Sequence, residues 1–167
     1  SSEAIHENKE EMRFYSRYYP RRLMAEVLLD GVSQVTEVST DFTKIGLPGA
    51  GAQDTDFYPS GTRAIQLYDS AVVSYFLKSF GRNQREITCD CQRSDEPSMV
   101  QVLHISNGDT INGKLQAADN WIDQMLQQSV TDAYIVDAAF VRALGRRPQG
   151  EELKRVLATF MEFEDPS

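Results

Sequence analysis

Apolar residues recur at helical spacing along four stretches of the chain, and they predict helices over residues 20–38, 109–128, 131–144 and 151–162. Gly145 and Pro148 separate the last two stretches, which leaves room for only a short turn. We therefore expect a C-terminal helical hairpin whose two helices pack antiparallel through Phe140, Leu144, Leu153 and Leu157.

The middle of the chain predicts shorter elements. Alternation over residues 62–68 predicts a short strand, and helical spacing predicts a short helix within residues 72–80. Residues 85–91 again have an extended pattern, and Pro97 is expected to begin another short helix. The predicted fold class is mainly α: a helical domain with one or two short strands and the C-terminal hairpin.

Two segments lack a periodic pattern. Residues 1–12 are polar, and we interpret them as a tether. Residues 39–61 contain repeated glycine and proline, which predicts a long Gly/Pro-rich loop. The Gly-Ala-Gly at 49–51 is not a phosphate loop, because no Gly-Lys-Ser/Thr follows it. The length of 167 residues fits a single domain over 1–167.

The charge balance narrows the possible partners. Lys and Arg number 17 and Asp and Glu number 25, which gives a net charge of -8. This charge argues against non-specific binding of nucleic acid or an anionic membrane, and no apolar run is long enough to span a bilayer. We therefore interpret the aromatic and arginine residues of 13–22 as packing on a neighbouring segment, not as a nucleic-acid surface.

Cys89 and Cys91 are the two cysteines, and a single residue separates them. They allow three interpretations: a disulfide with each other, which needs a tight turn; a metal site; or a structural role in the loop before the Pro97 helix. Two thiolates fill at most half of a tetrahedral zinc site, and the two histidines are distant in sequence. We therefore expect the cysteines to be structural and expect no metal site.

Charged residues cluster around these cysteines and allow two interpretations. A loop held by salt bridges is the simpler one. The other is a polar pocket in which arginine binds an anionic or sugar-like ligand. His104, on an otherwise apolar helix face, is either a hydrogen-bonded core histidine or a ligand. The candidate ligand-binding residues are Arg63, Arg82, Arg93, Glu96 and His104. No catalytic residue is assigned, because neither Gly-x-Ser-x-Gly nor a suitably placed acid/base pair is present.

Several blocks together resemble one family. They are YYPRRL at 18–23, GTRAIQL at 61–67, SYFL at 74–77, FGR at 80–82, CDCQRS at 89–94, EPS at 96–98, LHISNG at 103–108 and LGRRP at 144–148. In this order they resemble a planctomycete-specific domain of unknown function that occurs downstream of cytochrome c–like domains in large exported proteins. Asn83 departs from the pattern, because a proline is expected after Gly-Arg.

The resemblance implies context and transfers no catalytic residues. It implies an extracytoplasmic location, and haem in a separate domain of the parent protein, since Cys-x-x-Cys-His is absent from this chain. The family domain is longer, so we expect this chain to be its C-terminal portion, completed by another segment or chain. If so, the faces of Leu23 and Val27 or of Ile65 and Leu67 should contact that partner or stand as an apolar patch.

Two classes of function follow from these observations. The first is a non-catalytic structural or interaction module, which binds a ligand or partner within an exported, haem-associated protein. The second is an extracytoplasmic enzyme or redox or metal domain that uses the loop 89–96 together with Arg82 and His104. Convergence of the candidate arginines and His104 on one pocket would favour a ligand site, and dispersal in salt bridges would favour a structural role.

Overall fold

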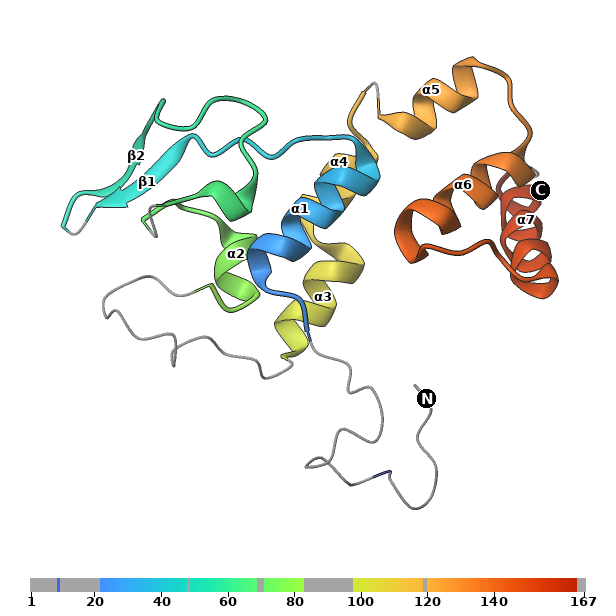
Figure 1. Cartoon of the computed structure of the whole chain (residues 1–167), viewed down its shortest axis with the longest axis horizontal. Helices are drawn as coiled ribbons and strands as arrows, with labels where there is room; N and C mark the ends of the chain where they lie inside the picture. The colour runs from blue at the N-terminus through green and yellow to red at the C-terminus, as the bar shows by residue number, and fades with distance from the viewer. Residues whose placement is uncertain are drawn as a thin grey trace.

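The structure, a computed structural model, describes residues 9, 22–47, 49–68, 71–82, 98–118 and 120–164. In chain order its elements are α1 (Ala25–Thr36), β1 (Lys44–Leu47), β2 (Gly51–Asp54), the 3₁₀ helix η1 (Ala64–Gln66), α2 (Tyr75–Ser79), α3 (Met99–Asn107), α4 (Asp109–Leu115), α5 (Trp121–Gln127), α6 (Asp132–Leu144) and α7 (Gly150–Glu164). Helices dominate and β1 pairs with β2, as Figure 1 shows, so the prediction of a mainly α fold is confirmed.

The core lies where α1 packs against η1, α2 and α4. Leu29 of α1 and Leu77 of α2 are each 1% exposed and form its centre. Aromatic side chains fill the space around them, because the connecting segments bring in rings that the short helices alone do not supply. The buried members of this cluster are Ala25, Leu29, Phe42, Tyr58, Ala64, Val72, Phe76, Leu77 and Phe80.

The strands lie where the sequence predicted a loop. Residues 39–61 contain the antiparallel pair β1 and β2, in register from Lys44 opposite Asp54 to Leu47 opposite Gly51. Gly49 and Gly51 adopt φ angles of 78° and 71°, which favour glycine and close the hairpin turn. β1 also bonds to residues 71–73, since Gly46 N–H donates to the Ala71 carbonyl at 2.7 Å. The prediction of a structureless loop is therefore wrong for this part of the segment.

The predicted strand over residues 62–68 is also wrong, because its centre forms η1. The carboxylate of Asp30, from α1, accepts hydrogen bonds from the backbone N–H groups of Ala64 at 2.6 Å and Ile65 at 3.1 Å. These bonds satisfy N–H groups at the start of the turn, as a helix cap does. The partner lies more than 30 residues away, so the local alternation gave no sign of it.

The helix predicted over residues 109–128 is divided in two. α4 ends at Leu115 and α5 begins at Trp121. Asn120 lies between them, 4% exposed, and its amide donates to the carbonyls of Leu115 and Ala117 at 2.9 Å each. Its side-chain oxygen accepts from the N–H groups of Ile122 and Asp123 and so caps α5. One side chain therefore satisfies both helix ends.

The C-terminal hairpin is confirmed. Thr131 caps α6, Gly145 ends it with a φ of 68°, and α6 packs against α7. Phe140, Leu153 and Leu157 are partly buried, whereas Leu144 is 59% exposed and contributes little to the contact. In Figure 1 the hairpin forms the red end of the molecule, away from β1 and β2.

Within the described segments, no helix combines the length and apolar character needed to cross a bilayer.

Candidate functional site

The predicted site residues lie in separate surroundings or outside the described residues. Four of them lie outside the described residues, so their predicted roles stay predictions: Cys89, Cys91, Arg93 and Glu96. Arg63 precedes η1, Arg82 follows α2, and His104 lies in α3.

Arg82 forms a buried ion pair with Glu26 of α1. The Arg82 Nε and Glu26 Oε1 atoms are 3.4 Å apart, and the two side chains are 10% and 7% exposed. The guanidinium also donates to the Leu67 carbonyl at 3.4 Å. It thus joins α1 to the segments that flank α2. The sequence suggested acidic partners among residues 90–96, whereas Glu26 is distant along the chain and could not be identified from spacing.

His104 lies inside a cluster of aromatic rings. Its ring centroid is 5.3 Å from that of Tyr75, 5.4 Å from that of Phe76 and 6.0 Å from that of Phe80. The residue is 8% exposed, and its Nε2 shares a hydrogen bond of 3.2 Å with the Thr110 hydroxyl. This geometry is that of a core histidine whose polar atom is satisfied, the first of the two interpretations.

The helix that carries His104 buries two of its polar residues and exposes its large apolar ones. Gln101 and His104 are both 8% exposed, and the Gln101 amide donates to the Ser79 carbonyl at 2.9 Å. Its side-chain oxygen also accepts from the Ser98 N–H in a capping box. α3 therefore docks on α2 through the hydrogen bond of Gln101 and the ring contacts of His104. We call the opposite surface the α3 outer face; its residues, 49–77% exposed, are Met99, Val100, Val102, Leu103 and Ile105.

A cavity of about 640 Å³, lined mostly by polar residue types, lies beside the C-terminal half of α1, and we call it the α1 cavity. One wall is α1 itself, a second is the segment that follows it, and a third is the turn before η1. Arg63 lines this cavity, whereas neither Arg82 nor His104 does, so these three candidates do not converge. The lining residues are Asp30, Ser33, Gln34, Glu37, Ser39, Thr40, Gly61, Thr62 and Arg63.

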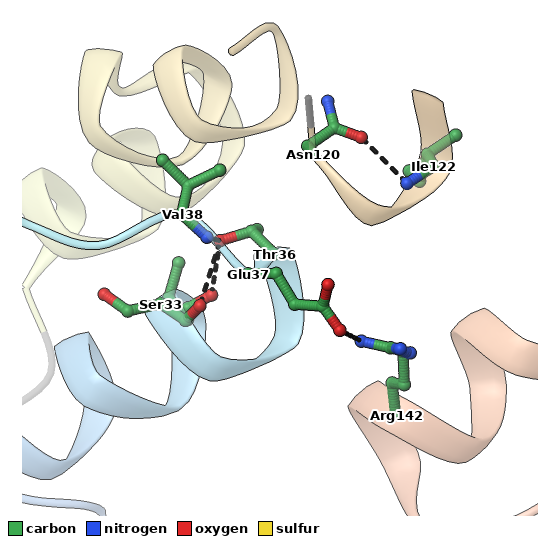
Figure 2. A network of polar contacts seen from close by, with 8 residues as sticks. Ser33, Thr36, Glu37, Val38, Asn120, Ile122 and Arg142 are labelled. Atoms are coloured by element: carbon green, nitrogen blue, oxygen red, sulfur yellow. Dashed lines mark hydrogen bonds and ion pairs between the residues drawn. The ribbon is translucent and has the colours of Figure 1, made fainter. Parts of the chain in front are cut away.

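Both carboxylates of the α1 cavity are already engaged. Asp30 accepts the two N–H bonds of η1 described above. Glu37 forms an ion pair of 2.6 Å with Arg142 of α6, as Figure 2 shows, and Arg142 lies over the Trp121 ring at 4.8 Å. Glu37 has a φ of 59°, a left-handed conformation that ends α1. No such ion pair occupies Arg63 within the residues that the structure describes.

Buried Lys114 holds the second wall of the cavity in place. Its Nζ donates to the carbonyls of Val38 at 2.6 Å and Ser39 at 2.9 Å. Burial lowers the pKa of Lys114, and the charge of Asp41 partly opposes that shift. Thr36 adds local bonds at the end of α1: its hydroxyl donates to the Val32 carbonyl and accepts from the Val38 N–H (Figure 2). The second wall is thus held both by Lys114 of α4 and by the bonds of Thr36 at the end of α1.

Sequence reasoning identified Arg63 but missed the rest of the α1 cavity. Half of the missed lining consists of hydroxyl residues, which are frequent in loops for reasons of turn formation alone. A possible signal was the density of Ser and Thr after α1, which continues through Thr43. No group of three or more potential metal ligands occurs among the residues that the structure describes.

Comparisons with known proteins identify a family. No curated protein and no solved structure matches the chain. A family model described as "PSD1: Protein of unknown function (DUF1553)" matches residues 1–160, nearly the whole of the 167 residues. The chain therefore belongs to the PSD1 family of proteins of unknown function.

Proposed function

We propose that this domain is a non-catalytic interaction module whose α3 outer face binds another segment or chain of polypeptide. The observation that carries the proposal is the orientation of α3, which turns the polar Gln101 and His104 inward and its five large apolar residues outward. A short helix in water is stabilised mainly by burial of its apolar face. The outward face of α3 is therefore suited to a partner that covers it.

The energetics favour an apolar partner. α3 has no charged residue among its nine, so its outer face offers no salt bridge to guide a polar ligand. Covering each of its exposed aliphatic side chains would stabilise a complex by roughly 1–2 kcal/mol before the costs of association. The partner that fits this surface is a polypeptide segment with an apolar face of its own, such as an amphipathic helix.

Other exposed apolar residues support the same proposal. Leu23 is 58%, Val27 36% and Ile65 45% exposed, on the faces where the sequence led us to expect a contact or an apolar patch. The engagement of Arg82 with Glu26 and of His104 with Thr110 further supports a non-catalytic role, because both side chains serve the core. The alternative, an enzymatic or redox role of the loop 89–96, stays a prediction.

The proposed setting is an extracytoplasmic planctomycete protein that also carries cytochrome c–like haem domains. It is supported by the resemblance of the sequence blocks quoted above and is consistent with membership of the PSD1 family. In an oxidising compartment Cys89 and Cys91 are free to form a disulfide with each other or with a partner segment.

Two exposed methionines allow a direct test. Met99 of the α3 outer face is 77% exposed, and Met161 of α7 is 72% exposed, so both should oxidise at similar rates in the purified chain. In the protein as the native cell contains it, we expect Met99 to be protected and Met161 to remain reactive. Mild peroxide treatment followed by peptide mass spectrometry measures both sites in one sample, and Met161 is the internal control.

Equal oxidation of Met99 in the purified chain and in the native protein would refute the proposal, because a covered α3 face must shield its most exposed residue. Protection of both methionines to the same degree would also refute it, since general burial in a large assembly does not single out α3.

A further inference from the structure

We propose that the α1 cavity is a binding site for a small hydroxylated monocarboxylate, of which a uronic acid is the simplest example. This inference does not depend on the α3 outer face, which involves a different set of residues. A volume of about 640 Å³ lies in the range of small-molecule sites and accommodates one or two sugar units.

The lining of the cavity indicates a ligand rich in hydroxyl groups. Ser33, Ser39, Thr40 and Thr62 bring hydroxyls to it, and Gln34 adds an amide. The hydroxyls of Ser33 and Thr40 bond each other at 3.3 Å, and that of Thr62 donates to the Pro59 carbonyl at 2.6 Å. Each of these oxygens keeps further capacity to accept a hydrogen bond, since a hydroxyl has two lone pairs. Alternating donors and acceptors of this kind match the hydroxyls of a sugar.

The charges indicate that the ligand carries one negative charge. Arg63 lines the cavity, and the fork of a guanidinium matches the two oxygens of a carboxylate. Asp30 and Glu37 line the same cavity, and although both are engaged, their negative field disfavours a doubly charged group such as phosphate. A carboxylate near Arg63, with neutral hydroxyls toward α1, satisfies both conditions.

The walls are positioned before any ligand arrives. Lys114 fixes the segment at Ser39 through two short bonds to backbone carbonyls. Asp30 fixes the turn that carries Arg63 by capping η1. A site whose walls are already held loses less conformational entropy when it binds, which favours measurable affinity even for a small polar ligand.

The experiment uses three matched probes in calorimetric titrations of the whole chain. They are D-glucuronate, D-glucose, which lacks the carboxylate, and acetate, which lacks the hydroxyls. We expect glucuronate to bind at least tenfold more tightly than either of the others, and Arg63→Gln to weaken it by roughly tenfold, the size of one charge-assisted hydrogen bond. Arg155→Gln, an exposed arginine of α7, is the control and should leave binding unchanged.

A second variant tests the hydroxyl contribution. Ser39→Ala should weaken glucuronate binding and leave the response to acetate as it was. Thermal unfolding of every variant confirms that it is folded, and Arg63 is exposed, so its replacement should not disturb the core. Equal affinity for acetate and glucuronate, equal affinity for glucose and glucuronate, unchanged binding in Arg63→Gln, or no binding at millimolar concentration would each overturn the proposal.

Discussion

Several polar side chains of this domain are buried or half-buried because each of them binds backbone atoms of another segment. Asp30 caps η1, Gln101 binds the end of α2, Lys114 holds the chain after α1, and Asn120 joins the ends of α4 and α5. A buried polar group without a partner is costly, so these residues specify which segments must meet. Composition alone would place them all on the surface.

Glu152 provides a prediction at the scale of single residues. Its carboxylate accepts both arms of the Arg146 guanidinium, at 2.7 and 2.8 Å, and the Gln149 N–H at 2.8 Å. The bond to Arg146, followed by that to Gln149, lowers the pKa of Glu152 from 4.5 to about 2. Because the folded-state pKa lies below the unfolded one, ionised Glu152 stabilises the fold. This contribution to stability is complete above pH 4.5 and declines as the pH falls toward 2.

We therefore expect Glu152→Gln to melt at a lower temperature than the parent at neutral pH, with the difference shrinking as the pH falls from about 4.5 to about 2. Thermal unfolding followed by circular dichroism across that range measures the difference. Glu151→Gln removes a carboxylate from the adjacent position and is the control. A difference in melting temperature that stays constant down to pH 2 would contradict this account of the pKa.

At the scale of elements, what could be predicted from the sequence depends on how local the stabilising contacts are. α6, α7 and their turn follow from apolar spacing, Thr131 and Gly145, all of which lie within one segment. The start of α2 was predicted too early, since Val72 pairs with Ile45 and Ser74 forms the cap. η1, the β1–β2 pair and the break before α5 likewise depend on partners or geometry that no local pattern contains.

The junction of α3 and α4 provides the prediction at this scale. Gly108 connects the two helices, and a Cβ at this position would collide with the carbonyl group and ring of His104. We expect Gly108→Ala to lower the free energy of unfolding by about 1–3 kcal/mol, as overpacking does. Urea denaturation measures the change.

Gly113, inside α4, is a matched control, because a Cβ there would meet nothing within 4 Å. Gly113→Ala should raise stability by about 0.5–1 kcal/mol, since alanine restricts the unfolded chain and favours the helix. Similar effects of the two substitutions, in either direction, would contradict the expected clash between a side chain at position 108 and His104.

Across the whole molecule, the candidate site shows the same difference between features set by local sequence and features set by distant segments. Residues such as Arg63, Arg82 and His104 could be selected from the sequence because their chemistry stands out. Their surroundings could not, because Glu26 and most of the hydroxyls of the α1 cavity come from segments distant in sequence. Residue type therefore identified the polar side chains, and the fold determines whether each of them stabilises the core or lines a cavity.

The pair of Arg82 and Glu26 gives the prediction at this scale, because it fastens α1 to the segments around α2. Arg82→Met leaves the Glu26 carboxylate buried beside an apolar side chain and should lower the free energy of unfolding by about 3–5 kcal/mol. The double variant Arg82→Met with Glu26→Leu should recover much of this loss, since it removes both buried charges. Urea denaturation of the single and double variants measures both effects.

An exposed pair of the same type is the control. Arg147 and Asp137 are 3.6 Å apart, and the Arg147 side chain is 80% exposed, so Arg147→Met should change the stability by less than about 1 kcal/mol. Equal losses of stability for Arg82→Met and Arg147→Met would mean that burial does not increase the cost of breaking an ion pair.

The bond from Lys114 to the Val38 carbonyl spans 76 residues and has a consequence for the order in which the chain folds. Closing a loop of this length costs conformational entropy that no local contact repays, so contacts of this kind slow folding. The segment after α1 also leaves the ribosome long before Lys114 does. The final conformation of this segment therefore has to wait until α4 has been synthesised, even though the segment itself emerges early.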